Sequence, residues 1–135
     1  HLTLLNFLKT PVNADGNEIA IAELIRLWRL EPDKYSSVLG TASVEIINKM
    51  EYEYQNPNAD NIVVRGFYIV INSEKKEDGS LDHLIYFKSK SFESGFTLNK
   101  YGGYGGKGMI QAEQFMPISE NEHLYIVLME SQKAK

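Results

Sequence analysis

Residues 62–72 constrain the fold more than any other stretch of this sequence. A strand here would put one set of apolar side chains on each face: Ile62, Val64, Tyr68 and Val70 on the first, and Val63, Phe67, Ile69 and Ile71 on the second. A strand with one solvated face alternates apolar and polar residues, which this stretch does not do. The pattern therefore predicts an interior strand covered on both faces.

Arg65 is the single charged residue of this predicted strand. Its stem could lie along apolar surface while its head group reaches solvent at a sheet edge. Alternatively, the guanidinium pairs with a carboxylate in a semi-buried site. We favour the pairing, because a lone buried charge is costly.

Helical periodicity begins at residue 18. Between residues 18 and 30 the apolar side chains recur at helical spacing and end in Trp28. Asp15 could cap this helix, since Glu18 follows at the spacing of a capping box, and Gly16 is free to take positive φ. A strand over residues 19–22 is the alternative, but it would place Glu23 and Arg26 on opposite faces, so that neither face is purely apolar.

A second helix is predicted to end at Met50. Asp33 is its candidate N-cap, and apolar residues at helical spacing follow from Tyr35 onward. Gly40, in the interior, costs about 1 kcal/mol relative to alanine. The apolar segment at residues 2–8 is too short to be assigned by periodicity.

Strand patterns dominate after residue 50. Tyr52 and Tyr54 alternate with acidic residues and predict a strand whose tyrosines face inward. A charged turn with Asp78-Gly79 leads into an antiparallel partner of the first strand. The predicted strands after residue 72 are residues 81–88, 92–98, 109–116 and 124–130.

Helices before residue 50 and strands after it indicate the α+β class, because a wound parallel sheet needs helices between its strands. We expect two N-terminal helices packed on a mainly antiparallel sheet of about four to six strands. At 135 residues, the chain has the usual size of a single domain, here residues 1–135.

Composition excludes several classes of function. The formal net charge of −4 argues against nucleic acid as the main partner, because phosphate binding requires clustered Lys and Arg. The chain has no cysteine, so disulfides and cysteine-based zinc sites are excluded. No apolar run approaches the roughly 20 residues that span a bilayer. The chain starts at His1 rather than Met, and we expect any membrane contact only through a segment before His1.

The glycine-rich run at residues 101–108 is the most unusual local composition. It lacks the spacing of a nucleotide-binding loop, because position 101 is Tyr101 and position 108 is Gly108. It could bind another anion, contact a partner protein, or simply connect two strands. The candidate residues for partner contact are Tyr101, Tyr104 and Lys107.

No catalytic, cofactor or metal site is assigned. The histidines His1, His83 and His123 have no mutual spacing suited to a metal, and no nucleophile elbow of the Gly-x-Ser-x-Gly kind occurs. Glu51 and Glu53 would share one face of a strand, where they could act as an acid–base pair. The simpler interpretation is the solvated face of an amphipathic strand.

The first 50 residues have a recognisable order of features: an apolar segment at 4–12, a polar turn ending at Gly16, a helix pattern with Trp28, and a second helix pattern at 35–50. This layout resembles small pilin-like and tight-adherence-type membrane-anchored surface proteins of archaea and bacteria. The resemblance implies a transmembrane helix ahead of this region and a soluble part that faces outward.

We therefore expect a non-catalytic extracytoplasmic domain at the cell surface that binds a protein partner or assembles with itself, although a cytoplasmic location stays open. One alternative is a small ligand-binding domain or enzyme, with a pocket between helices and sheet lined by Trp28, Tyr68 and Tyr86. Another is a structural protein of a phage or mobile element. If the domain has only two layers, the uncovered face of residues 62–72 becomes a candidate interaction surface.

Overall fold

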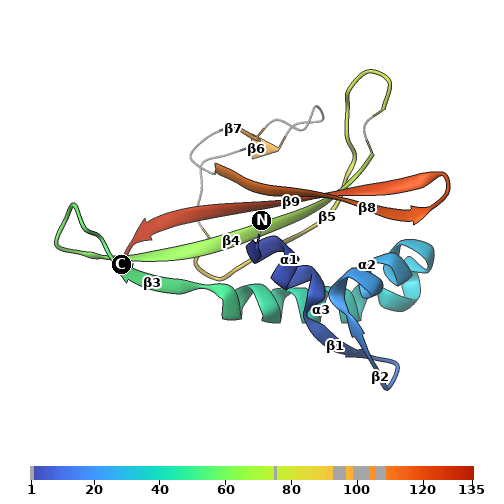
Figure 1. Cartoon of the computed structure of the whole chain (residues 1–135), viewed down its shortest axis with the longest axis horizontal. Coiled ribbons are helices and arrows are strands. Elements are labelled where there is room, and N and C mark those ends of the chain that lie inside the picture. Colours follow the sequence, from blue (N-terminus) through green and yellow to red (C-terminus); the bar gives the residue numbers. More distant parts are fainter. Residues whose placement is uncertain (1, 75, 93–96, 99–103, 106–108) are drawn as a thin grey trace.

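The computed structural model describes residues 2–74, 76–92, 97–98, 104–105 and 109–135. Helices lie on one side of a long, twisted antiparallel sheet, and a small pair of strands lies on the other side (Figure 1). The predicted α+β class is confirmed. None of the helices in the described residues is long and apolar enough to cross a membrane.

The main sheet is built around β4 (Ile62–Ser73), the strand predicted from the apolar run. Along one edge β4 pairs with β9 (Glu122–Ala134) over nearly its whole length. Along the other edge it pairs first with β3 (Tyr52–Gln55) and then with β5 (His83–Lys88). The strand β8 (Met109–Ser119) pairs with the far side of β9. Its position between β9 and two other strands confirms that β4 is interior.

The N-terminal third carries the helices α1 (Leu2–Lys9), α2 (Ile21–Leu30) and α3 (Pro32–Met50). A hairpin of β1 (Pro11–Ala14) and β2 (Asn17–Ala20) separates α1 from α2. The remaining pair, β6 (Thr97–Leu98) with β7 (Tyr104–Gly105), forms a separate two-stranded sheet. The helix α1 adds to the two predicted helices, and its buried residues Leu4, Phe7 and Leu8 follow helical spacing.

The predicted cap of the first helix is wrong. Asp15 and Gly16 form the turn of the β1–β2 hairpin, with φ angles of 54° and 80°. Asp-Gly is a preferred pair for a two-residue hairpin turn, because both positions need positive φ. The Asn13 side chain accepts a hydrogen bond from the Gly16 N–H at 3.1 Å. The helix therefore begins at Ile21 rather than at residue 18.

The second predicted cap is also displaced. Asp33 lies inside the first turn of α3, and Glu31 occupies the N-cap position. Pro32 starts the helix, where its fixed φ suits the first turn and its missing N–H costs no hydrogen bond. The Asp33 carboxylate then lies near the positive end of the helix dipole.

The helix-facing side of the sheet forms the larger core. Phe67, Ile69 and Ile71 of β4 are buried in one cluster with Trp28 of α2, and Ile46 of α3 packs against it. The prediction that helices cover this face is confirmed.

The opposite face of β4 is covered by the chain itself. Tyr68 and Val70 are buried in a second cluster, with Leu81 and Phe92 from the segments on either side of β5. Both faces of the strand are therefore covered, as its apolar pattern predicts. At these residues the second face is not an open interaction surface.

The chain crosses from the edge of β5 to this second face over Gly66. We call residues 89–92 the crossing segment. Ser89 is fully buried, its N–H donates to the Phe67 carbonyl at 2.8 Å, and its hydroxyl accepts from the Phe67 N–H at 2.8 Å. A Cβ at Gly66 would lie 2.6 Å from the backbone of Phe92. Only glycine allows this close approach.

Gly40, in the middle of α3, has no such constraint. Apart from its chain neighbours and the backbone of its own helix turn, a Cβ at this position would meet no atom within 4 Å. We expect Gly40→Ala to stabilise the protein by roughly 0.5–1 kcal/mol, because alanine loses less backbone entropy in a helix. Urea denaturation followed by circular dichroism measures the change. An unchanged or lower midpoint would contradict the expectation.

Candidate functional site

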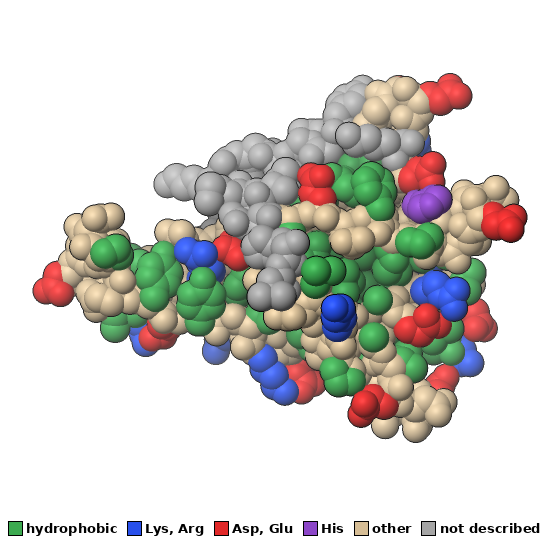
Figure 2. All heavy atoms as spheres, in the orientation of Figure 1, with side chains coloured by type: hydrophobic (Ala, Val, Ile, Leu, Met, Phe, Trp, Pro, Cys, Tyr) green, Lys and Arg blue, Asp and Glu red, His purple; other side chains and the backbone are tan. Residues whose placement is uncertain are grey.

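The sheet extends beyond the helices at one end. The strand β3, the start of β4 and the end of β9 project to the left of α1 and α3 in Figure 1, next to the C-terminus. In Figure 2 this end shows hydrophobic side chains with basic and acidic ones among them. We call it the strand-end surface, and it consists of residues 52–55, 62–65 and 130–135.

An ion pair lies on the helix-facing side of the strand-end surface. Arg65 Nη1 donates to Glu130 Oε2 at 2.8 Å, and the two side chains are 23% and 10% exposed. The two residues come from the paired strands β4 and β9. Arg65 lies opposite Gln132 and Glu130 lies opposite Phe67, two pairs along, so both side chains are on the same face of the sheet. The predicted pairing of Arg65 with a carboxylate is confirmed.

Two tyrosines of β3 enclose the same guanidinium. The Arg65 carbon Cζ lies 5.5 Å from the ring centroid of Tyr52 and 5.3 Å from that of Tyr54. Arg65 Nη2 also donates to the Tyr54 hydroxyl at 3.4 Å, whereas its buried Nε has no hydrogen-bond partner. Burial lowers the pKa of Arg65, but the Tyr54 hydrogen bond and the Glu130 charge outweigh it and raise the pKa.

Tyr52 faces inward, as the alternation predicts, but it is not buried. Its side chain faces the side of the sheet that the helices cover, and its ring lies 6.4 Å from that of Phe67. The residue is nevertheless 46% exposed, whereas Tyr54 is half-buried. The helices end before they reach β3, so an inward position here is not a buried one.

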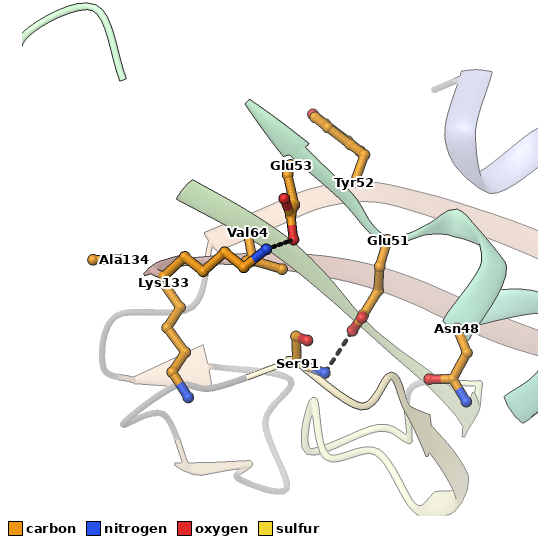
Figure 3. A pocket seen from close by; sticks show the side chains of 9 residues that line it. Asn48, Glu51, Tyr52, Glu53, Val64, Ser91, Lys133 and Ala134 are labelled. Atoms are coloured by element: carbon orange, nitrogen blue, oxygen red, sulfur yellow. Dashed lines mark hydrogen bonds and ion pairs between the residues drawn. The ribbon is translucent and has the colours of Figure 1, made fainter. Parts of the chain in front are cut away.

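The reverse side of the strand-end surface holds a shallow pocket of about 610 Å³ (Figure 3). It lies between the end of α3, the crossing segment and the last residues of β9. Its lining is mostly polar or charged: Asn48, Glu51, Tyr52, Glu53, Val64, Ser91, Lys133, Ala134 and Lys135.

The two carboxylates of this pocket are already engaged. Glu51 accepts from the Ser91 N–H at 2.6 Å, and Lys135 Nζ donates to Glu53 at 2.8 Å. Glu53 is thus on a solvated strand face, as predicted, but Glu51 is half-buried and holds the crossing segment. The described residues contain no cluster of three or more metal-ligating side chains. The pocket suits polar contacts rather than acid–base chemistry.

A second concave surface lies between β1 and α3. This groove of about 580 Å³ has partly buried apolar residues along it, among them Val12, Val38 and Ile46. Lys49 and Glu45 pair at its rim at 3.1 Å. No feature of the sequence pointed to it.

The predicted pocket of Trp28, Tyr68 and Tyr86 does not form. Trp28 is 6% exposed within the helix-side core, and Tyr68 is buried on the opposite face of the sheet. Tyr86 is 60% exposed and stacks on Tyr68, with ring centroids 5.5 Å apart. The sheet separates the tryptophan from the tyrosines, because Tyr68 and Phe67 alternate across it.

The predicted partner contacts of the glycine-rich run lie largely outside the described residues. This holds for Tyr101 and Lys107, whereas Tyr104 belongs to β7. Of the histidines, His83 bonds through Nδ1 to the Asn72 side chain, and His123 lies 3.6 Å from Glu74. His83 and His123 therefore each have a separate polar neighbour.

Tyr52, Tyr54, Arg65 and Glu130 form one group, which we call the tyrosine–arginine cluster. It is the site that sequence reasoning missed. The alternation at Tyr52 and Tyr54 and the lone charge Arg65 were visible, but Glu130 is 65 residues from Arg65 in the chain. Comparison with protein-family models finds no match, and comparisons with curated proteins and solved structures find no similar chain.

Proposed function

We propose that this chain is a non-catalytic interaction or assembly domain of a membrane-anchored or surface protein, and that it acts outside the cytoplasm. The observation that carries the proposal is the tyrosine–arginine cluster of the strand-end surface. There Tyr52 is 46% exposed beside the Arg65 guanidinium, on a part of the sheet that the helices leave uncovered.

The composition of this cluster favours protein contact. Tyrosine and arginine are enriched at the energetically dominant positions of protein interfaces. Tyrosine supplies a large contact area at low entropic cost, because its side chain has few rotatable bonds. A flat, partly apolar ring next to a fixed cation is suited to binding a protein surface.

The cluster is also held in place before any partner arrives. Glu130 fixes one side of the Arg65 guanidinium at 2.8 Å, and Tyr54 takes a further N–H. Tyr52 in turn lies against Tyr54, with ring centroids 6.1 Å apart. Binding then orders few additional side chains, which lowers its entropic cost.

The surface location rests on the layout of the first 50 residues. The order of apolar segment, turn and two helix patterns resembles pilin-like, membrane-anchored proteins, and the structure has helices at residues 21–30 and 32–50. A ligand-binding or enzymatic role has less support, because Trp28 and Tyr68 lie on opposite faces of the sheet.

The test is site-specific photocrosslinking in intact cells that express the whole gene product. A photoreactive phenylalanine analogue at position 52 should crosslink to one discrete protein, either a partner or a second copy. The same analogue at position 86, an exposed tyrosine of β5 whose ring stacks on Tyr68, is the matched control. External protease should remove the crosslinked domain from intact cells.

Two outcomes would count against the proposal. Equal crosslinking patterns at positions 52 and 86 would show that the strand-end surface is not a specific contact. Protection from external protease until the cells are lysed would contradict the extracytoplasmic location.

A further inference from the structure

The outer strand β8 presents an open edge, separate from the strand-end surface. Within the described residues β8 pairs only with β9. Phe115, at its centre, is 61% exposed and is the most exposed large apolar side chain in the described part of the chain. Its ring lies against that of Tyr125, with centroids 4.9 Å apart.

The backbone groups of alternate β8 residues point away from β9. The Phe115 carbonyl accepts from the Gln114 side chain at 2.9 Å, which fits a carbonyl directed away from β9. Pro117, two residues on, has no N–H, and proline is tolerated in a sheet where that group would face outward. By the alternation of an antiparallel ladder, Glu113, Phe115 and Pro117 then share the outward position.

The usable part of this edge is short. The pairing of β8 with β9 is irregular between Ile110 and Ala112 and again between Pro117 and Ser119. Such bulges and an edge proline restrict further pairing. They leave residues 112–116 as one regular stretch on which another strand can add.

We propose that this stretch is a self-association edge, on which β8 of a second copy of this chain pairs antiparallel about a two-fold axis at Gln114. The outward N–H and C=O of Glu113 bond to those of Phe115 in the second copy, and the symmetry repeats the pair. The two main sheets then form one continuous sheet.

The proposed register avoids repulsion between like charges. Each Glu113 lies opposite Phe115 of the second copy, so no two like charges are directly opposite. On the other edge of the sheet, β3 contains Glu53, and Glu51 immediately precedes the strand at the end of α3. Pairing of two copies centred on Tyr52 would set Glu51 opposite Glu53, which is unfavourable. Like charges therefore disfavour this register of β3, whereas the β8 register sets no like charges directly opposite.

The register also buries the exposed aromatic rings. The two Phe115 side chains become diagonal neighbours on one face of the joined sheet, about 7–8 Å apart between backbones and within reach of aromatic contact. Five paired residues bury less area than a permanent dimer requires, so the association is weak and depends on concentration. It uses neither Tyr52 nor Arg65.

Sedimentation velocity over a range of protein concentrations tests the proposal with two variants of the same position. Phe115→Glu places a carboxylate opposite Glu113 of the second copy, and Phe115→Lys places an ammonium there. We expect wild type to dimerise with rising concentration. The Kd of Phe115→Glu should exceed that of Phe115→Lys about tenfold, because each symmetric dimer contains the pair twice.

Tyr86→Glu is the control, because Tyr86 is equally exposed on β5. It should leave the Kd unchanged, and thermal unfolding verifies that all three variants fold. A wild type that stays monomeric at every concentration would overturn the proposal, and so would equal Kd values for the two Phe115 variants. Neither result bears on crosslinking at position 52, so this failure and that of the proposed function are distinguishable.

Discussion

Replacing Gly66 by alanine is expected to lower the free energy of unfolding by about 3 kcal/mol, at the upper end of the usual cost of overpacking. The new methyl group would lie 2.6 Å from both the N and Cα atoms of Phe92 and 2.8 Å from the carbonyl carbon of Ser91. These are backbone atoms, so no side-chain rotation relieves the clash.

The crossing segment cannot easily move aside. Asn48 accepts from the Lys90 N–H at 2.7 Å, Glu51 accepts from the Ser91 N–H, and Ser89 is bonded to Phe67 in both directions. Relief of the clash would break bonds of this kind or lift Phe92 from the second cluster. Both routes cost free energy.

Urea denaturation measures this effect against Gly40→Ala. Both changes add one methyl group at a glycine, but Gly40 has open space around its Cβ position and Gly66 does not. The two midpoints should therefore move in opposite directions. A Gly66→Ala midpoint within experimental error of wild type would show that the crossing segment is not held as described.

Replacing Arg65 by methionine is expected to cost about 2 kcal/mol. Glu130 is only 10% exposed and would lose its cationic partner, and an unpaired buried charge is strongly destabilising. The figure is below the 3–5 kcal/mol range for fully buried pairs, because the Arg65 side chain is 23% exposed and solvent screens part of the interaction.

The double variant Arg65→Met with Glu130→Met separates the pair from its surroundings. Removal of both charges is expected to restore most of the lost stability, since apolar residues of similar volume often replace a buried pair at little cost. A double-mutant cycle in urea gives the coupling energy. Additive single effects would mean that the 2.8 Å contact contributes no coupling.

Much of the fold could be predicted from the sequence, because the spacing of apolar residues indicates which faces of a helix or strand are buried. The run at residues 62–72 is apolar on both faces, and β4 is covered on both faces, by helices on one side and by Leu81 and Phe92 on the other. The helix patterns before residue 50 likewise match α2 and α3. Element boundaries were less predictable, since Asp15-Gly16 serves a hairpin turn and not a helix cap.

The sequence could predict that Arg65 has a carboxylate partner, but it could not predict which residues form the site. A charge within an apolar strand demands a partner, so a carboxylate for Arg65 could be expected. Which carboxylate depends on the register between β4 and β9, which joins residues 65 positions apart in the chain. The expected pocket does not form, because Trp28 and Tyr68 lie on opposite faces of the sheet. This too depends on the tertiary structure.

By itself, the sequence determined the class of the fold, the interior position of β4 and the need to neutralise Arg65. These follow from local periodicity and from the cost of burying charge, both of which act on residue type. Only the tertiary structure decided that Glu130 is the partner, that Phe92 crosses over Gly66, and that Tyr52 and Phe115 remain exposed. Those outcomes depend on strand register and on where the helices end, which are set by contacts between residues distant in the chain.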